Sequence, residues 1–128
     1  MKLGDVLRFT SDQAIGHGIR DKMHVYLGDK KHFRARAEYA FLFISSSDYG
    51  NDFAISRADY PNFLTHDSYI SCGNLVFYSH QELLDAKVEK VGIISPEHLV
   101  ALRNRLIDHD NMVRWQIDVA CNALAGAL

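Results

Sequence analysis

Several features that mark common protein classes are scarce in this 128-residue sequence. It has only two cysteines, Cys72 and Cys121, and they form neither a dense disulfide framework nor a C-x-x-C motif. No apolar run approaches the ~20 residues that span a bilayer, and the first residues lack the apolar segment of a secretion signal. We therefore expect a soluble, reduced, cytoplasmic protein with no membrane association.

An excess of charge of one sign is also absent. Fourteen Lys and Arg residues stand against sixteen Asp and Glu residues, which gives a formal net charge of −2. This balance excludes a bulk polycation, so any binding of nucleic acid needs a local basic patch. Basic or potentially basic residues gather at Arg20, Lys22, Lys30, Lys31, His32, Arg34 and Arg36. The aromatic rings of Phe33 and Tyr39 lie beside them, which fits single-stranded nucleic acid, but a solvated basic loop fits equally well.

The first two thirds of the chain consist of short apolar runs separated by Gly, Asp, Asn and Ser. Strands are predicted at residues 6–10, 23–28, 39–45, 53–56 and 68–72, with a strand or turn at 75–78. The run at 39–45 is apolar on both faces, as a central strand is. The polar segments 11–22 and 29–36 are predicted to be loops, and residues 81–88 are ambiguous between helix and strand.

Helical periodicity dominates the remainder of the chain. A helix is predicted to begin after Ser95, because a serine N-cap followed by Pro96 is a strong helix start. A final helix is expected near 113–124, with Asp110 as a candidate cap. Strands followed by helices predict a mostly β, α+β fold of small-barrel type. We expect one domain over residues 1–128, with the barrel at about 2–94 and C-terminal helices at about 95–125.

Standard catalytic and cofactor motifs are missing. The sequence has no G-x-x-x-x-G-K-[ST], no G-x-S-x-G and no H-E-x-x-H motif, and none of its seven histidines has the spacing of a metal ligand. No metal and no cofactor are therefore predicted. Ser45 begins a polar cluster at the end of the strongest strand, which fits either a cleft or the cap of a sheet. His66 and Asp67 could form a catalytic pair, but a turn held by the Asp67 carboxylate is favoured.

Several short segments, taken in order, resemble the MazF/PemK family of toxins from toxin–antitoxin systems, and PemK-like members most closely. Gly4-Asp5-Val6 resembles the start of the family's first strand, and Met23-His24-Val25-Tyr26-Leu27 resembles the strand that follows its basic loop. Phe41-Leu42-Phe43-Ile44-Ser45 resembles its buried strand, which ends in Thr or Ser. Asp67-Ser68-Tyr69-Ile70 and Gly92-Ile93-Ile94-Ser95 resemble a later strand and a helix start. The shared order over residues 2–106 carries the resemblance.

The resemblance implies an SH3-like β-barrel with C-terminal helices, assembled as a homodimer and bound by a cognate antitoxin. It also implies a metal-independent endoribonuclease that cleaves single-stranded RNA through the substrate's own 2′-hydroxyl. Lys22 stands where the family has a catalytic Arg, and Ser45 where it has a Thr or Ser. Arg20 and His24 flank Lys22 and complete the predicted catalytic set, with His17 and His66 as other candidates for proton transfer. The predicted RNA-binding residues are Lys30, Lys31, Arg34 and Arg36.

A second hypothesis is a non-catalytic SH3-like module that keeps the fold and binds a peptide or an antitoxin-like partner. Its groove would use the aromatic residues Phe33, Tyr49, Phe53, Tyr60 and Phe63. Salt dependence separates the two hypotheses, because RNA binding weakens steeply as salt rises. The apolar residues around Trp115 predict a helix that packs on its own barrel, with contact to a second copy as the alternative.

Overall fold

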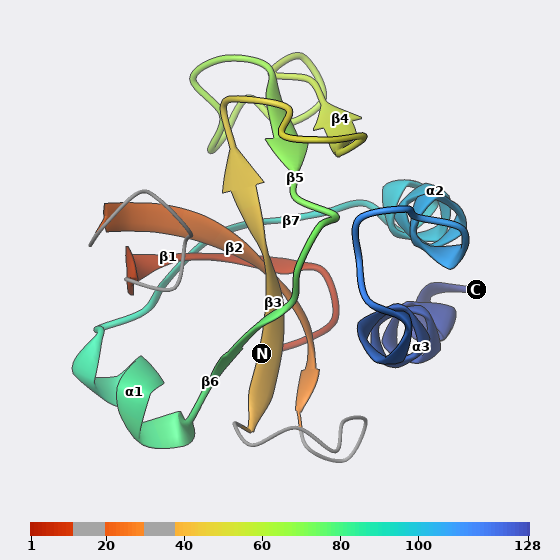
Figure 1. The fold of residues 1–128 in the computed structure, drawn as a ribbon. Helices are drawn as coiled ribbons and strands as arrows, with labels where there is room; N and C mark the ends of the chain where they lie inside the picture. Colours follow the sequence, from red (N-terminus) through yellow and green to blue (C-terminus); the bar gives the residue numbers. More distant parts are fainter. Residues whose placement is uncertain (12–19, 30–37) are drawn as a thin grey trace.

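The computed structural model describes residues 1–11, 20–29 and 38–128. This part of the chain is mostly antiparallel sheet, curled into a half-barrel with helices beside it (Figure 1). The strands are β1 (Asp5–Ser11), β2 (Arg20–Asp29), β3 (Tyr39–Ser45), β4 (Phe53–Ile55), β5 (Ser68–Ile70), β6 (Val76–Tyr78) and β7 (Glu89–Ile93). The helices are α1 (His80–Asp85), α2 (Pro96–Ile107), α3 (Arg114–Leu124) and a final 3₁₀ turn, η1 (Ala125–Ala127).

The strand order is β4-β5-β3-β2-β1-β7, and β6 pairs with β3 outside this path. Strand β3 is central: β2 pairs along one edge, while β6 pairs with the start of β3 and β5 with its end. Figure 1 shows β3 upright through the middle of the molecule, crossed by β1 and β2, with α2 and α3 stacked on one side. The prediction of a central strand at 39–45 is confirmed.

The sheet separates two hydrophobic cores, because successive side chains of a strand point to opposite faces. Leu42 of β3 belongs to the main core, which also contains Leu102 of α2 and Leu124 of α3. Phe43, the next residue, belongs to a second and mainly aromatic core. The second core consists of Leu7, Phe9, Tyr26, Phe41, Phe43, Val76, Tyr78 and Leu83. Both faces of β1, β2 and β3 are thus largely covered.

Local sequence signals explain the helices. Ser95 caps α2 by accepting the N–H of His98 at 3.3 Å, as predicted. The ambiguous segment 81–88 contains the end of α1, which begins with a capping box formed by Ser79 and Glu82. Helix α3 begins after Val113, which makes no side-chain cap, so the expectation for Asp110 is wrong. No helix in the described ranges is long and apolar enough to span a membrane.

The loop predicted at residues 11–22 is wrong at its end, where β2 begins. Residues 20–22 are predicted to end a loop, but β2 begins at Arg20, and Lys22 pairs with Phe9 of β1. Charged side chains fit here because the ladder hydrogen bonds come from the backbone and the side chain of Asp21 is exposed. Residues 12–19 and 30–37, which make up most of the two predicted loops, lie outside the described residues.

Candidate functional site

Strand β2 directs Lys22, His24 and Tyr26 toward the second core, because alternate residues share a face. Tyr26 belongs to that core, and the His24 ring packs on Phe9 and Phe43. Lys22 extends the same face toward the beginning of β2. Its side chain is half-buried, and its Nζ atom lies 5.7 Å from the centre of the Phe43 ring. This distance is within the range of a cation–π interaction, so an aromatic surface supports the ammonium group.

Ser45, the last residue of β3, shares a face with Phe43 and pairs with Tyr69 of β5. The Ser45 side chain is buried, and its Oγ atom accepts the N–H of Ser47 at 3.2 Å. A serine hydroxyl that accepts one hydrogen bond still has its own proton to donate. Ser45 therefore provides a hydrogen-bond donor at this end of the strand.

The strand register relates the two main predicted positions. The last β2–β3 pair is His24 with Phe43, and Lys22 and Ser45 each lie two residues beyond it. By strand alternation both side chains have the parity of the His24–Phe43 pair, and they lie just beyond it, where β3 leaves β2 and pairs with β5 (Figure 1). Tyr69 shares this face, because directly paired residues of antiparallel strands point the same way. We call Lys22, Phe43, Ser45 and Tyr69 the Lys22–Ser45 face.

Phe43 and Tyr69 are the two residues of this face that the sequence does not identify as site residues. The Tyr69 side chain is half-buried. Only its pairing with Ser45 places it here, and no local pattern around Tyr69 indicates that pairing.

The backbone of Arg20 begins β2 and pairs with Ser11, and strand alternation gives it the same parity as Lys22. The Arg20 side chain lies outside the described part. The four predicted RNA-binding residues, Lys30, Lys31, Arg34 and Arg36, also lie outside it, as does His17. Of the predicted site residues, the structure therefore describes the side chains of Lys22, His24, Ser45 and His66.

His24 has an environment that argues against proton transfer. Its side chain is 0% exposed and stacks on Phe9 with the ring centres 3.9 Å apart. Its Nδ1–H donates to the Lys22 carbonyl at 3.0 Å, and Nε2 lies 3.4 Å from the Tyr78 hydroxyl. Burial lowers the pKa of His24 to about 3, although the hydrogen bond to the Lys22 carbonyl opposes this shift. The imidazole is neutral at pH 7 and out of reach of a substrate, so its contribution is packing.

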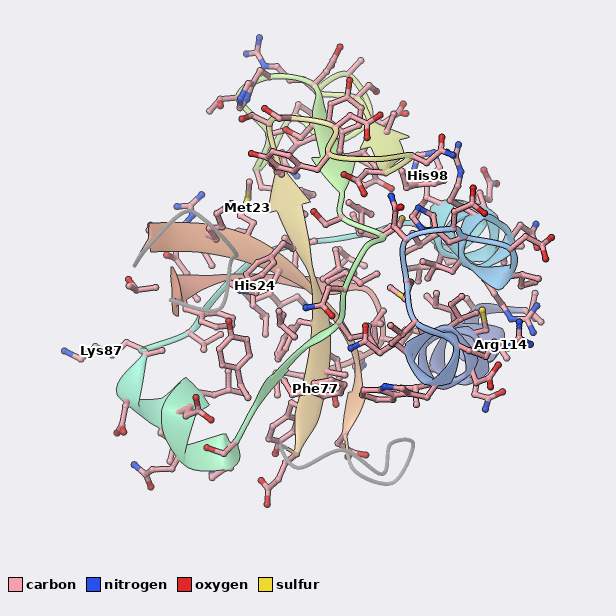
Figure 2. All side chains as sticks on the ribbon, in the orientation of Figure 1. Met23, His24, Phe77, Lys87, His98 and Arg114 are labelled. Carbon is pink, nitrogen blue, oxygen red and sulfur yellow. The ribbon has the colours of Figure 1, made fainter. Side chains whose placement is uncertain are left out.

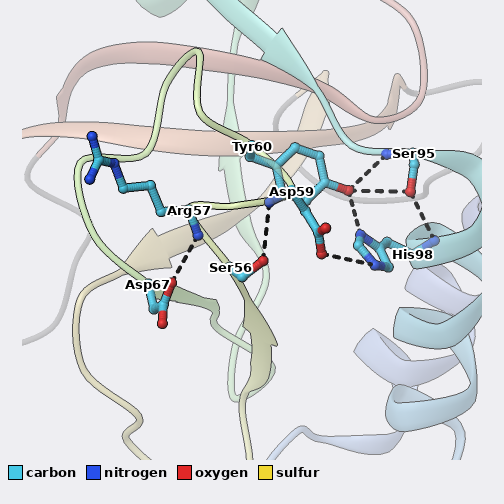
Figure 3. A network of polar contacts seen from close by, with 7 residues as sticks. All are labelled: Ser56, Arg57, Asp59, Tyr60, Asp67, Ser95 and His98. Carbon is cyan, nitrogen blue, oxygen red and sulfur yellow. Dashed lines mark hydrogen bonds and ion pairs between the residues drawn. The ribbon is translucent and has the colours of Figure 1, made fainter.

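A polar network outside this face joins the segment 56–67 to the start of α2 (Figure 3). The Tyr60 hydroxyl lies 2.5 Å from His98 Nδ1 and accepts the N–H of Ser95 at 3.0 Å. An Asp59 carboxylate oxygen lies 4.0 Å from Nε2 of the same imidazole. The Tyr60 hydroxyl is thus held between Ser95 and His98, so this arrangement clamps a loop onto a helix.

The segment around His66 and Asp67 forms a turn held by the Asp67 carboxylate, as the sequence favours. The Asp67 carboxylate accepts the backbone N–H of Arg57 at 2.9 Å, which ties together two parts of the connection between β4 and β5 (Figure 3). The exposed His66 ring instead contacts the neighbouring Thr65 hydroxyl at 3.1 Å. Among the described side chains, Asp67 makes no contact with an imidazole, so the two residues do not form a catalytic pair.

The aromatic residues proposed for a peptide groove are mostly occupied elsewhere. Tyr60 and Phe63 are buried in the main core, and Phe53 is partly buried against it. Tyr49 is exposed, and Phe33 lies outside the described residues. The described members of the set therefore do not line one shared groove.

Comparisons of this chain with models of known protein families and with curated proteins found no match. The functional argument therefore depends on the geometry of the Lys22–Ser45 face and on the short sequence motifs.

Proposed function

We propose that this chain is a toxin-like endoribonuclease of a type II toxin–antitoxin system, which cleaves single-stranded RNA without a metal ion. The observation that carries the proposal is the shared face of Lys22 and Ser45. The MazF/PemK resemblance selects these two residues, which are 23 positions apart, from sequence alone. A shift of one residue in strand register would have put their side chains on opposite faces of the sheet. The curled antiparallel sheet supports the finer assignment to an SH3-like barrel of that family.

In the proposed reaction, the 2′-hydroxyl oxygen of the substrate attacks the adjacent phosphorus as it loses its proton. The bond from phosphorus to the 5′ oxygen breaks, and that oxygen gains a proton. The products are a 2′,3′-cyclic phosphate and a 5′-hydroxyl. Negative charge grows on the phosphate oxygens in the transition state, so groups that stabilise this charge contribute most to the rate.

The Lys22–Ser45 face supplies two such groups. The Lys22 ammonium offers a point charge on an aromatic support, and the Ser45 hydroxyl offers a hydrogen-bond donor. Arg20 adds a second cation from the same strand parity in this proposal. Tyr69 supplies a ring on which a base next to the cleaved phosphate can stack. His24 takes no proton in the proposal, because it is buried and neutral.

The proposal extends to partners. Lys30, Lys31, Arg34 and Arg36 bind RNA phosphates away from the cleaved bond. The protein acts in the cytoplasm as a homodimer, and a cognate antitoxin inhibits it by covering the basic surface. The net charge of −2 is compatible with this, because the basic residues gather between residues 20 and 36.

Cleavage of a long single-stranded RNA in EDTA tests the proposal. We expect discrete cuts that leave cyclic phosphate ends, and a loss of rate of about 100-fold or more in Lys22→Ala and in Ser45→Ala. Lys87→Gln is the matched control, since it removes a positive charge near α1, away from this face (Figure 2). Circular dichroism establishes that each variant is folded.

Three results would contradict the proposed ribonuclease activity. They are no cuts, cuts that require added magnesium, or equal rates in Lys22→Ala, Ser45→Ala and the parent. Salt-insensitive binding of a peptide without cleavage would support the non-catalytic module instead.

A further inference from the structure

Three potential metal ligands meet inside the molecule although they are far apart in the sequence. Asp52 precedes β4, Cys72 follows β5, and His109 lies between α2 and α3. All three side chains are buried, and their ligand atoms lie within 4.8 Å of one another. This group lies outside the Lys22–Ser45 face and has no role in the proposed cleavage.

We propose that Asp52, Cys72 and His109 bind one divalent zinc-type ion that fastens these three segments together. One oxygen, one sulfur and one nitrogen ligand form the mixed set that zinc accepts and that hard ions such as magnesium do not favour. The charges also balance: a carboxylate, a thiolate and a neutral imidazole together neutralise a divalent cation. A site without net charge avoids the large cost of burying an uncompensated ion.

The surrounding hydrogen bonds resemble the outer shell of a metal site. His109 Nε2–H donates to the Asn51 carbonyl at 3.0 Å, which leaves the lone pair of the neutral ring on Nδ1. The Asp52 carboxylate accepts the backbone N–H groups of Cys72 and Tyr49, each at 2.9 Å. Each carboxylate oxygen keeps a second lone pair for a metal. The tautomer of His109 and the orientation of Asp52 are thus fixed by backbone groups.

Metal binding requires small, defined changes. Ligand atoms around a tetrahedral zinc lie about 3.3–3.6 Å apart, so no pair in this group must close by more than about 1.5 Å. The Asn111 N–H, 3.2 Å from His109 Nδ1, gives way to the ion. The Cys72 thiol, which contacts the Ile70 carbonyl at 3.4 Å, releases its proton to solvent as the metal–sulfur bond forms. The group contains three ligands among the described residues, so a water molecule takes the fourth position.

The site would stabilise the chain just after the candidate catalytic face. Asp52 anchors the turn that begins at Asp48, whose carboxylate accepts the N–H groups of Gly50 and Asp52 at 3.0 Å each. This turn follows Ser45 within a few residues, and His109 ties it to the two long helices. A metal here lies outside the Lys22–Ser45 face, and the cleavage proposed above stays metal-independent.

Cobalt(II) substitution tests the site directly. Protein purified without a metal-affinity column or chelator should contain about one zinc per chain. After this zinc is removed with a chelator and the chelator is dialysed away, cobalt should give a thiolate-to-cobalt charge-transfer band at a one-to-one ratio. Cys72→Ser should abolish this band, and Asp52→Asn should weaken cobalt binding by at least about ten-fold. Cys121→Ser is the matched control, because Cys121 is the other buried free cysteine and lies outside the group.

Folded parent protein that holds no zinc and gives no band with excess cobalt overturns the proposal. So does a band that survives in Cys72→Ser or disappears in Cys121→Ser. The parent measurements are decisive even if a variant fails to fold. They also leave the ribonuclease proposal untouched, since RNA cleavage is measured separately.

Discussion

The buried imidazole of His24 makes the stability of this protein depend on pH. In the unfolded chain His24 takes up a proton below its ordinary pKa of 6.5, whereas burial in the folded chain lowers that pKa to about 3. Between these two values the unfolded state binds more protons than the folded state, so stability falls as the pH falls. From this one group we expect a loss of about 2 kcal/mol between pH 8 and pH 5.

Replacing His24 with phenylalanine isolates this contribution. Phenylalanine keeps a flat ring on Phe9 but has no proton to gain, and it gives up the hydrogen bond to the Lys22 carbonyl. The absolute stability of His24→Phe differs from that of the parent for this reason, so the quantity of interest is the change with pH. We expect the parent to lose about 2 kcal/mol more than His24→Phe over the same range.

Urea unfolding at pH 8, 7, 6 and 5, followed by far-ultraviolet circular dichroism, measures the effect. His66→Gln is the matched control, since it removes an exposed histidine and should follow the parent. Parallel curves for the parent and His24→Phe would refute the reasoning, because they would mean that His24 takes up its proton equally in both states.

Three further substitutions test the packing and capping. The methyl group added in Gly92→Ala would lie 2.3 Å from the Phe63 ring in the main core, so we expect the free energy of unfolding to fall by about 1–3 kcal/mol. The methyl group added in Gly73→Ala meets nothing within 4 Å, so this control should change the free energy of unfolding by less than about 0.5 kcal/mol. Equal unfolding midpoints for the two alanine variants would contradict this. Val113 is 54% exposed at the N-cap of α3, and its side chain makes no capping hydrogen bond. Val113→Asp should therefore stabilise the protein by about 1 kcal/mol. An unchanged thermal midpoint would show that α3 gains nothing from a cap.

The sequence predicts the strands well where burial is two-sided or patterned. Residues 39–45 form β3 as expected, because a short run that is apolar on both faces suits the centre of a sheet between two cores. The sequence predicts a loop at the charged start of β2, because composition carries no information on backbone pairing with β1. The capping box of Ser79 and Glu82 indicates the start of α1 in the sequence, but a helix of six residues is too short to show helical periodicity.

The sites depend on information that the sequence does not contain locally. Ser45 marks the end of a strand, yet its neighbour Tyr69 follows only from the β3–β5 register. The group of Asp52, Cys72 and His109 has no ligand spacing at all, because the sheet and the α2–α3 connection bring its members together. Burial of His24 is equally non-local, since its neighbours come from β1, β3 and β6.

The second core explains why a buried histidine belongs next to a candidate catalytic lysine. A charged His24 would lie beside the Lys22 ammonium, and the nearby Lys22 charge indeed contributes to lowering the pKa of His24. The neutral ring instead packs on Phe43, the same ring over which Lys22 Nζ lies. Keeping His24 uncharged therefore leaves Lys22 as the cation at this point of the face and fixes the aromatic surface beneath it. In this arrangement His24 acts on the face through packing, and the proposed chemistry uses Lys22 and Ser45.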